Sequence, residues 1–175
     1  TMKKVLSFDF GASSGRAMLA SFDGEKISMQ EIHRFSNDTV IVNGTMYWDI
    51  LRLFFEIKTS ISKAVNQGGF DAIGIDTWGV DFGLIDKHGK LISNPVHYRD
   101  LRTEGIPEKV FEEISKDDIY LHTGTQFMRI NTLYQLMYLK YNEPEALESA
   151  EKMLLIPDLF AYMLTGEMRA EASIA

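Results

Sequence analysis

Three apolar-rich runs of strand length lie within the first 35 residues, and the third alternates with a period of two. Apolar-rich runs lie at Val5–Phe10, Arg16–Phe22 and Lys26–Phe35, and short glycine-containing segments separate them. The second separator is Asp23-Gly24, a dipeptide that favours tight hairpin turns. The pattern therefore predicts three strands in a meander.

The period then changes to that of a helix. Apolar residues recur at helical spacing between Asp49 and Gln67, where Asp49 is a suitable N-cap and Gly68-Gly69 a suitable end. We expect a short strand at Thr39–Val42 before this helix and a short buried strand at Ala72–Asp76 after it. The strand–helix–strand order predicts that the last strand joins the sheet in parallel.

The remainder of the chain changes from strands to helices. Strands are expected at Val80–Ile85 and Lys90–Ile92, on either side of a turn at Asp86–Gly89, and a polar loop follows at Pro95–Arg102. The later pattern predicts helical segments at Pro107–Ser115, Asp117–Leu121, Thr132–Tyr141, Pro144–Ala150 and Asp158–Leu164, with a brief strand at 154–156. The fold class is therefore α/β, with a mixed sheet, flanking helices and a mainly helical C-terminal part.

Composition narrows the classes of partner. The chain has 175 residues, enough for one domain with a sizeable core, and its net charge is −7. This balance argues against nucleic acid or an anionic membrane as the main partner. The chain lacks cysteine, a signal-peptide pattern and an apolar segment of membrane-spanning length. We expect a cytoplasmic protein, in which the glycosylation sequons at Asn37 and Asn43 are chance matches.

The turn after the first strand carries the first candidate chemistry. Asp9 ends the strand, and Gly11, Ala12, Ser13, Ser14, Gly15 and Arg16 follow it. Glycines permit positive φ, so successive N–H groups can converge on one anion, and the hydroxyls and Arg16 add donors for phosphate oxygens. Asp9 is placed to face a metal ion or the transferred group. The alternative is a tight hairpin in which Gly and Ser only satisfy the turn geometry.

A second candidate lies at the junction between two predicted strands, in Gly74–Gly83. Ligands in open α/β sheets bind beyond the carboxyl ends of strands. Trp78 offers an apolar face to sugar carbons, Asp76 or Asp81 can bind hydroxyls, and Gly79 allows close approach of the backbone. The alternative is a buried tryptophan at a sheet edge beside turn acids.

A third candidate is the loop that contains Arg99 and Arg102 among aromatic residues. Arginine donors bind hydroxyls and phosphates in a fixed fork, but a surface ion-pair cluster is the commoner arrangement. Several other site types have no motif in the chain: the P-loop, the G-x-G-x-x-G turn, the H-E-x-x-H metal site and the G-x-S-x-G elbow.

Taken in order, these motifs resemble the FGGY-type sugar kinases. The first is D-x-G-x-S-x-G-R at Asp9–Arg16, and later segments continue the match to the branch that acts on L-rhamnulose: Glu31–Phe35, Gly74–Phe82, Tyr98–Asp100, Asp118–Tyr120, Asn131–Leu136, Pro157–Phe160 and Leu164–Gly166. The resemblance covers nearly the whole chain. It implies a ribonuclease-H-like domain of the actin/hexokinase type, with a mixed sheet of five or more strands.

The resemblance also implies an activity, ATP-dependent phosphorylation of L-rhamnulose at its 1-hydroxyl, with Mg²⁺. It suggests that Gly11 and Ala12–Arg16 contact ATP phosphates, that Asp9 lies near Mg²⁺ and the γ-phosphate, and that Gly79 contacts the sugar. Trp78, Asp81 and Arg99 are extensions from their positions beside these motifs.

One departure from the family pattern is large. The family's catalytic base is an aspartate in a His-Asp-Thr segment of a second domain, and this sequence contains no such segment. We therefore expect residues 1–175 to be a truncated N-terminal kinase domain, inactive alone, with the base and the adenine pocket beyond Ala175. The alternatives are a non-catalytic sugar- or nucleotide-binding module, a kinase for fuculose, xylulose or glycerol, and a glycosidase using Asp76 and Asp81.

Overall fold

The computed structural model describes residues 2–174, and residues 3–36 form the predicted meander. The strands are β1 (Lys3–Phe10), β2 (Ser14–Phe22) and β3 (Ile27–Ser36). β2 pairs antiparallel with both neighbours, and a register shift at Ala17/Met18 interrupts its pairing with β3. At the turn between β2 and β3, Asp23 Oδ1 accepts hydrogen bonds from the N–H groups of Glu25 and Lys26, both at 2.8 Å. These bonds lower the pKa of Asp23 and fix the turn.

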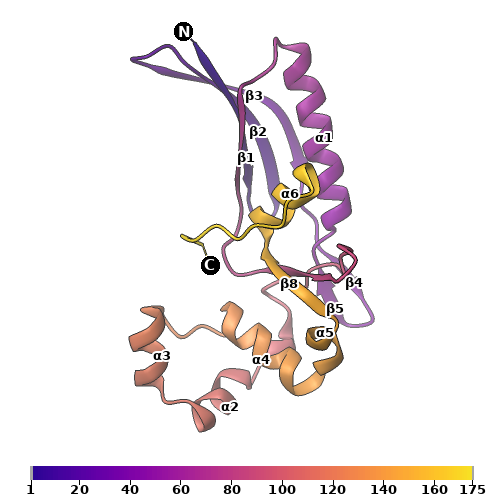
Figure 1. The fold of residues 1–175 in the computed structure, drawn as a ribbon, viewed down its shortest axis with the longest axis vertical. Helices are drawn as coiled ribbons and strands as arrows, with labels where there is room; N and C mark the ends of the chain where they lie inside the picture. Colours follow the sequence, from indigo (N-terminus) through magenta and orange to yellow (C-terminus); the bar gives the residue numbers. More distant parts are fainter. Residues whose placement is uncertain (1, 175) are drawn as a thin grey trace.

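The long helix α1 (Ile50–Asn66) begins and ends close to the predicted residues. The Asp49 side chain caps it by accepting from the N–H of Arg52 at 3.2 Å. At the other end Gly68 and Gly69 adopt φ of 94° and 75°, a left-handed conformation that glycine tolerates and other residues rarely adopt. Figure 1 shows α1 running alongside β1–β3 in the upper half of the molecule.

The strand β6 (Ala72–Asp76) confirms the predicted parallel addition, because it pairs with β1 in parallel. The expectation that β6 is buried is wrong. The main sheet has the order β3-β2-β1-β6, which leaves β6 at an edge, and Ile73 on it is 36% exposed. An apolar run of this length is equally compatible with an edge strand, since the sequence does not say how many neighbours a strand has.

The expectation of five or more strands in the sheet is also wrong, because the main sheet contains four strands within residues 2–174. The strand β7 (Phe82–Asp86) does not extend it. Instead β7 pairs antiparallel with β8 (Ala150–Leu155) in a separate two-stranded sheet. β8 is longer than the brief strand predicted at 154–156, and only an isolated bridge, Ile85 to Leu91, represents the strand expected at 90–92.

A second small hairpin precedes α1. The expected strand near Thr39–Val42 is present as β4 (Val40–Val42), and it pairs with β5 (Thr45–Tyr47), which we did not predict. Asn43 and Gly44 connect the two strands with φ of 50° and 86°. Both central residues of the turn therefore have positive φ, as a tight type I′ hairpin requires.

Helices dominate the part of the chain after Leu101. They are η1 (Leu101–Thr103), α2 (Ile106–Glu113), α3 (Lys116–Thr123), α4 (Thr132–Asn142), α5 (Pro144–Glu148) and α6 (Ile156–Thr165). In Figure 1 α2–α5 gather at the end of the molecule opposite the turn between β2 and β3, while α6 returns to the sheet. No helix within residues 2–174 combines the length and apolarity that crossing a bilayer requires.

The hydrophobic core follows this division. The main cluster joins the sheet to α1 and α6, with Phe10 stacked on Phe160 at 5.0 Å between ring centroids. A separate cluster around Val110, Ile119 and Tyr134 holds α2, α3 and α4 together. The helical end therefore has a core of its own beside the sheet-based core.

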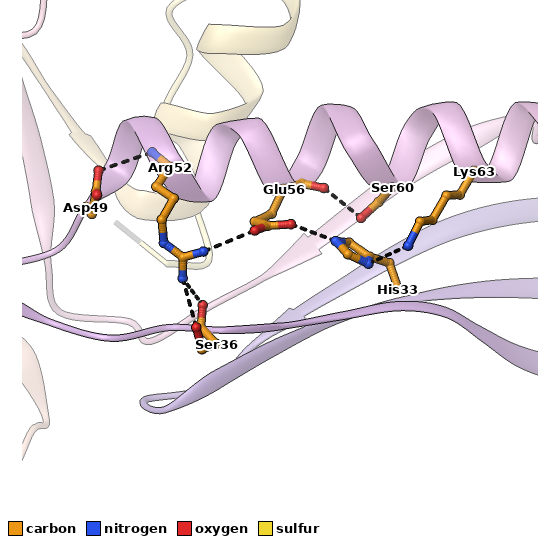
Figure 2. A network of polar contacts seen from close by, with 7 residues as sticks. All are labelled: His33, Ser36, Asp49, Arg52, Glu56, Ser60 and Lys63. Carbon is orange, nitrogen blue, oxygen red and sulfur yellow. Dashed lines mark hydrogen bonds and ion pairs between the residues drawn. The ribbon is translucent and has the colours of Figure 1, made fainter.

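A polar network joins β3 to α1 (Figure 2). His33 Nε2 lies 2.6 Å from Glu56 Oε2, and Lys63 Nζ lies 2.8 Å from His33 Nδ1. Because a lysine ammonium only donates, Nδ1 accepts and Nε2 carries the proton toward Glu56. Arg52 donates to Glu56 Oε1 at 3.0 Å and also to the backbone carbonyl of Ser36. The first turns of α1 therefore hold the C-terminal end of β3. In space, this end lies beside the loop that follows β1.

Candidate phosphate and sugar site

The loop after β1 is closed by its own backbone. The N–H of Gly11 donates to the carbonyl of Ser14 at 2.9 Å. Among the described residues, no backbone hydrogen bond outside the strand ladders uses the N–H of Ala12 or Ser13. Ser13 and Ser14 are exposed, so unpaired N–H groups and hydroxyls share one accessible turn. Such a turn can bind an anion.

The two glycines of the loop serve close packing rather than positive φ, which corrects the reason we gave for them. Neither Gly11 nor Gly15 has positive φ. An added Cβ on Gly11 would lie 3.0 Å from the carbonyl oxygen of Ser14, and one on Gly15 would lie 2.3 Å from Cε2 of Phe35. Gly11 thus allows the turn to close, and buried Gly15 allows Phe35 to pack beneath it.

Asp9 and Arg16 form an ion pair at the base of the loop. Arg16 Nε and NH2 lie 3.0 and 2.9 Å from Asp9 Oδ2, and both side chains are about half exposed, at 47% for Arg16 and 50% for Asp9. Arg16 is therefore directed at Asp9 in this structure. Their ion pair is accessible enough to exchange for contacts with a phosphate group or a cation.

Asp9 also has a second carboxylate beside it. Asp9 and Asp76 are paired positions at the carboxyl ends of the parallel strands β1 and β6, and both residues are exposed. Within residues 2–174 no cluster of three or more metal-ligating side chains occurs. Mg²⁺ commonly takes only one or two protein carboxylates and completes its shell with water and phosphate oxygens, so these two residues fit that ion.

Gly79 follows β6 and opens onto a cavity of about 450 Å³. Apart from its own chain neighbours, no atom of residues 2–174 would lie within 4 Å of a Cβ added at Gly79, and the residue does not have positive φ. The cavity is lined by Gly79 and by polar and aromatic side chains from α3, α4 and the segment between them, including His122, Thr123, Thr125, Phe127 and Asn131. Hydroxyls, an amide, an imidazole and aromatic rings are the groups that a sugar needs.

Two hydrogen bonds connect α4, which forms one wall of this cavity, to the segment that follows β6. Thr132 Oγ1 and Gln135 Nε2 both donate to the carbonyl of Val80, at 2.8 and 3.3 Å. On the opposite wall, His122 Nδ1 donates to the carbonyl of Asp118 at 2.7 Å. In the neutral ring this leaves Nε2 as an acceptor.

Trp78 packs within an aromatic stack. Its ring lies 3.8 Å from that of Trp48, which in turn stacks on His97 at 3.9 Å. One face of Trp78 is therefore already covered, and its indole N–H is buried with no partner among the described residues. Burial, with Arg99 nearby, lowers the pKa of His97 to about 4, so this ring is neutral near pH 7.

Asp81 differs from the expected substrate contact. It is 0% exposed, and its oxygens accept from Trp48 Nε1 at 2.5 Å, from the N–H of Tyr98 at 3.1 Å and from Gln135 Nε2 at 2.9 Å. Burial raises its pKa despite these donors. With three protein donors and no accessible surface, Asp81 holds the site together and is not positioned to contact a substrate.

Arg99 is exposed and lies over the ring of Tyr98, with 5.3 Å from its guanidinium carbon to the ring centroid. It does not line the cavity at Gly79. The structure therefore brings Asp9, the loop and Asp76 together, opens a cavity at Gly79, and leaves Arg99 apart from that cavity.

Sequence reasoning missed two groups at the site. His122, Thr125 and Asn131 line the cavity, and we assigned no functional role to their segment from the sequence. Asn37 is 1% exposed and bonds the loop after β1. A buried asparagine directly after a strand carries no distinguishing pattern, so only the fold reveals it.

Comparison with known proteins places the chain in context. The family model described as "FGGY family of carbohydrate kinases, N-terminal domain" matches residues 4–175. A rhamnulokinase from Halalkalibacterium halodurans is 44% identical over 172 residues, with 97% of this chain and 36% of the relative covered. One from Bacteroides thetaiotaomicron is 45% identical over 174 residues, covering 99% and 36%. The chain thus spans about a third of the length of these relatives.

Solved structures share the fold at lower identity. A gluconate kinase from Lactobacillus acidophilus superposes with a TM-score of 0.82 at 18% identity, over 96% of this chain and 34% of that one. A Plasmodium falciparum glycerol kinase with ADP has a TM-score of 0.70 at 16% identity, over 99% and 40%.

Proposed function

The chain belongs to the FGGY family of carbohydrate kinases, and from that premise we propose that it is the N-terminal domain of an enzyme that phosphorylates L-rhamnulose at its 1-hydroxyl with ATP. The observation that carries the proposal is the 44–45% identity to rhamnulokinases along nearly the whole chain. ADP in a glycerol kinase of the same fold supports a nucleotide as phosphoryl donor. We also assign the domain to the ribonuclease-H-like, actin/hexokinase type.

The loop after β1 is the proposed phosphate site. Backbone N–H groups and the hydroxyls of Ser13 and Ser14 donate to phosphate oxygens, and Arg16 adds a guanidinium when it leaves Asp9. Phosphoryl transfer depends mainly on positioning and on electrostatic stabilisation of the phosphate oxygens, and this loop supplies donors for both. When bound, Mg²⁺ neutralises phosphate charge; Asp9 and Asp76 are the residues that would hold it.

The cavity at Gly79 is the proposed sugar site. The absence of a side chain at Gly79 leaves room for the ligand, and His122 Nε2, Thr125 and Asn131 offer hydrogen bonds to sugar hydroxyls. Trp78 and Asp81 set the position of the Gly79 turn from behind. We place the catalytic base outside the described residues, in a second domain. The relatives are longer than this chain, and their additional length is enough for such a domain.

A coupled-enzyme assay on the full gene product tests the proposal. With MgATP and a panel of L-rhamnulose, L-fuculose, xylulose and glycerol, we expect kcat/KM to be highest for L-rhamnulose. A clear preference for another member of the panel would overturn the sugar assignment. Nucleotide binding without turnover of any sugar would favour a non-catalytic binding module.

A further inference from the structure

Asn37 lies directly under the loop after β1, although no sequence feature marks it as functional. It follows β3 and is 1% exposed. Its backbone N–H donates to the carbonyl of Ser13 at 3.0 Å, and its side-chain Nδ2 donates to the carbonyl of Gly11 at 2.8 Å. One buried residue thus binds two carbonyls of the same four-residue turn.

These two bonds fix the orientation of two peptide groups. In a planar trans peptide the C=O and the N–H point in opposite directions. Holding the Gly11 carbonyl toward Asn37 directs the N–H of Ala12 away from it, and holding the Ser13 carbonyl does the same for Ser14. For Ser14 that direction is across the turn toward Gly11, because β2 lies between β3 and β1, so the free N–H group that this arrangement orients is that of Ala12.

The orientation of the Asn37 amide follows from the same contact. With the amide reversed, Oδ1 would face the carbonyl oxygen of Gly11, so Nδ2 must occupy that position. Oδ1 is then buried and has no partner among the described residues. A buried acceptor without a partner is destabilising, so the favourable contribution of this side chain comes from its donor.

The network in Figure 2 holds Ser36, the residue before Asn37. Arg52 of α1 donates to the backbone carbonyl of Ser36 and, at 3.3 Å, to its hydroxyl. Arg52 is in turn paired with Glu56, which binds His33 of β3. Hydrogen bonds and ion pairs therefore lead from the body of α1 to Ser36, the covalent neighbour of Asn37.

We propose that Asn37 is a positioning residue that presets the phosphate loop, holding the Gly11 and Ser13 carbonyls in place so that the Ala12 N–H group faces the nucleotide phosphates. This inference rests on the proposed function for its ligand. An unconstrained turn would have to order its peptide groups on binding, and presetting them removes that cost. Loss of the amide donor should therefore weaken nucleotide binding selectively.

The test uses the full gene product with Asn37→Asp, which keeps the shape but replaces the Nδ2 donor with an oxygen that faces the Gly11 carbonyl. The matched control is Tyr162→Phe, which removes the hydrogen bond to the carbonyl of Gly89 and lies outside the network of Figure 2. We expect Asn37→Asp to raise the KM for MgATP, and its Kd by calorimetry, by about tenfold or more. The KM for the sugar should change less than twofold, and Tyr162→Phe should alter thermal stability alone.

Three outcomes separate this inference from the proposed reaction. An Asn37→Asp protein that binds MgATP like the wild type, or whose KM values for ATP and sugar rise together, overturns the role of Asn37. A wild type that binds MgATP but phosphorylates no sugar overturns the reaction and leaves Asn37 testable by calorimetry. If the variant does not fold, amide hydrogen exchange on the wild type decides: saturating MgATP should protect the Ala12 amide, and an unprotected amide refutes the proposal.

Discussion

Gly15 lies so close to the ring of Phe35 that a Cβ on Gly15 would stand 2.3 Å from Cε2 of that ring. We expect Gly15→Ala to destabilise the protein by about 1–3 kcal/mol, because the methyl group overpacks a buried site next to the phosphate loop. Urea denaturation measures the change. Since Phe35 also packs against Phe10 at 5.5 Å between centroids, the displaced ring will disturb the core at the end of β1.

A second substitution tests the cause. Phe35→Leu shortens the group that the methyl meets, so Gly15→Ala should cost less in that background than in the wild type. Gly74→Ala is the matched control, because its Cβ would meet only Ser7 Oγ at an ordinary 3.7 Å. Equal losses at Gly15 and Gly74, or no relief by Phe35→Leu, would show that the contact with Phe35 is not responsible.

Gly79 is expected to respond in the opposite way. Its backbone does not need glycine and the space beside it is empty, so Gly79→Leu should change the free energy of unfolding by less than about 1 kcal/mol. The added side chain fills the cavity, so sugar binding should fall at least tenfold while MgATP binding is retained. Calorimetry with L-rhamnulose across Gly79→Ala, Gly79→Val and Gly79→Leu should show losses that increase with side-chain size. Undiminished sugar affinity in Gly79→Leu would move the sugar site elsewhere.

The sequence predicted local structure wherever the deciding signal is local. Period-two alternation and Asp23-Gly24 gave the meander, and Asp49 with Gly68-Gly69 gave both ends of α1. The hairpin between β4 and β5 also had its signal, since Asn43-Gly44 is a strong type I′ dipeptide, but we interpreted it only as part of a glycosylation sequon.

Features that depend on distant partners were not predictable in this way. The pairing of β7 with β8 joins segments more than 60 positions apart, and the sequence of neither strand identifies the other as its partner. Asp81 looked like a ligand because it is an acid in a glycine-rich turn. Its burial depends on Trp48 and Gln135, which reach it from 33 residues before and 54 residues after. The turn between β1 and β2 was local and predictable, whereas its hydrogen bonds with Asn37 were not.

His97 should make the protein sensitive to acid. Burial lowers its pKa to about 4 in the folded state, against 6.5 for an ordinary imidazole, so between these pH values the unfolded state binds a proton that the folded state does not. The contribution of His97 to the free energy of unfolding is therefore fully present above pH 6.5. It is lost as the pH drops toward 4, which lowers the stability by roughly 3 kcal/mol at most. His97→Phe keeps a ring against Trp48 without a titrating group. Urea denaturation between pH 7 and 4.5 should show a smaller loss for this variant, and parallel curves would contradict the assignment.

Asp81 should show the largest dependence of stability on a single polar side chain. Asp81→Ala leaves the donors of Trp48, Tyr98 and Gln135 without an acceptor in a buried site, which should cost about 3–5 kcal/mol. Asp81→Asn should cost less, about 1–2 kcal/mol, because one carbonyl oxygen still serves Trp48 and Tyr98. The amide nitrogen of the new asparagine then faces the amide nitrogen of Gln135. The Gln135 amide cannot turn around without losing the 3.1 Å hydrogen bond that its oxygen accepts from Arg102.

The pH dependence of stability tests whether Asp81 carries a buried charge or only fills space. Burial raises the pKa of Asp81, so the folded state takes up a proton more readily than the unfolded state, and the cost of the buried charge is relieved as the pH falls through the folded pKa. The stability difference between wild type and Asp81→Asn should therefore widen as the pH is lowered from 7 toward 4. This trend is opposite in sign to that of His97, and measuring each variant against the wild type separates the two. A difference that stays constant with pH would mean that Asp81 does not carry a desolvated charge, and the buried carboxylate would then be no more than a shape that fills the space between Trp48 and α4.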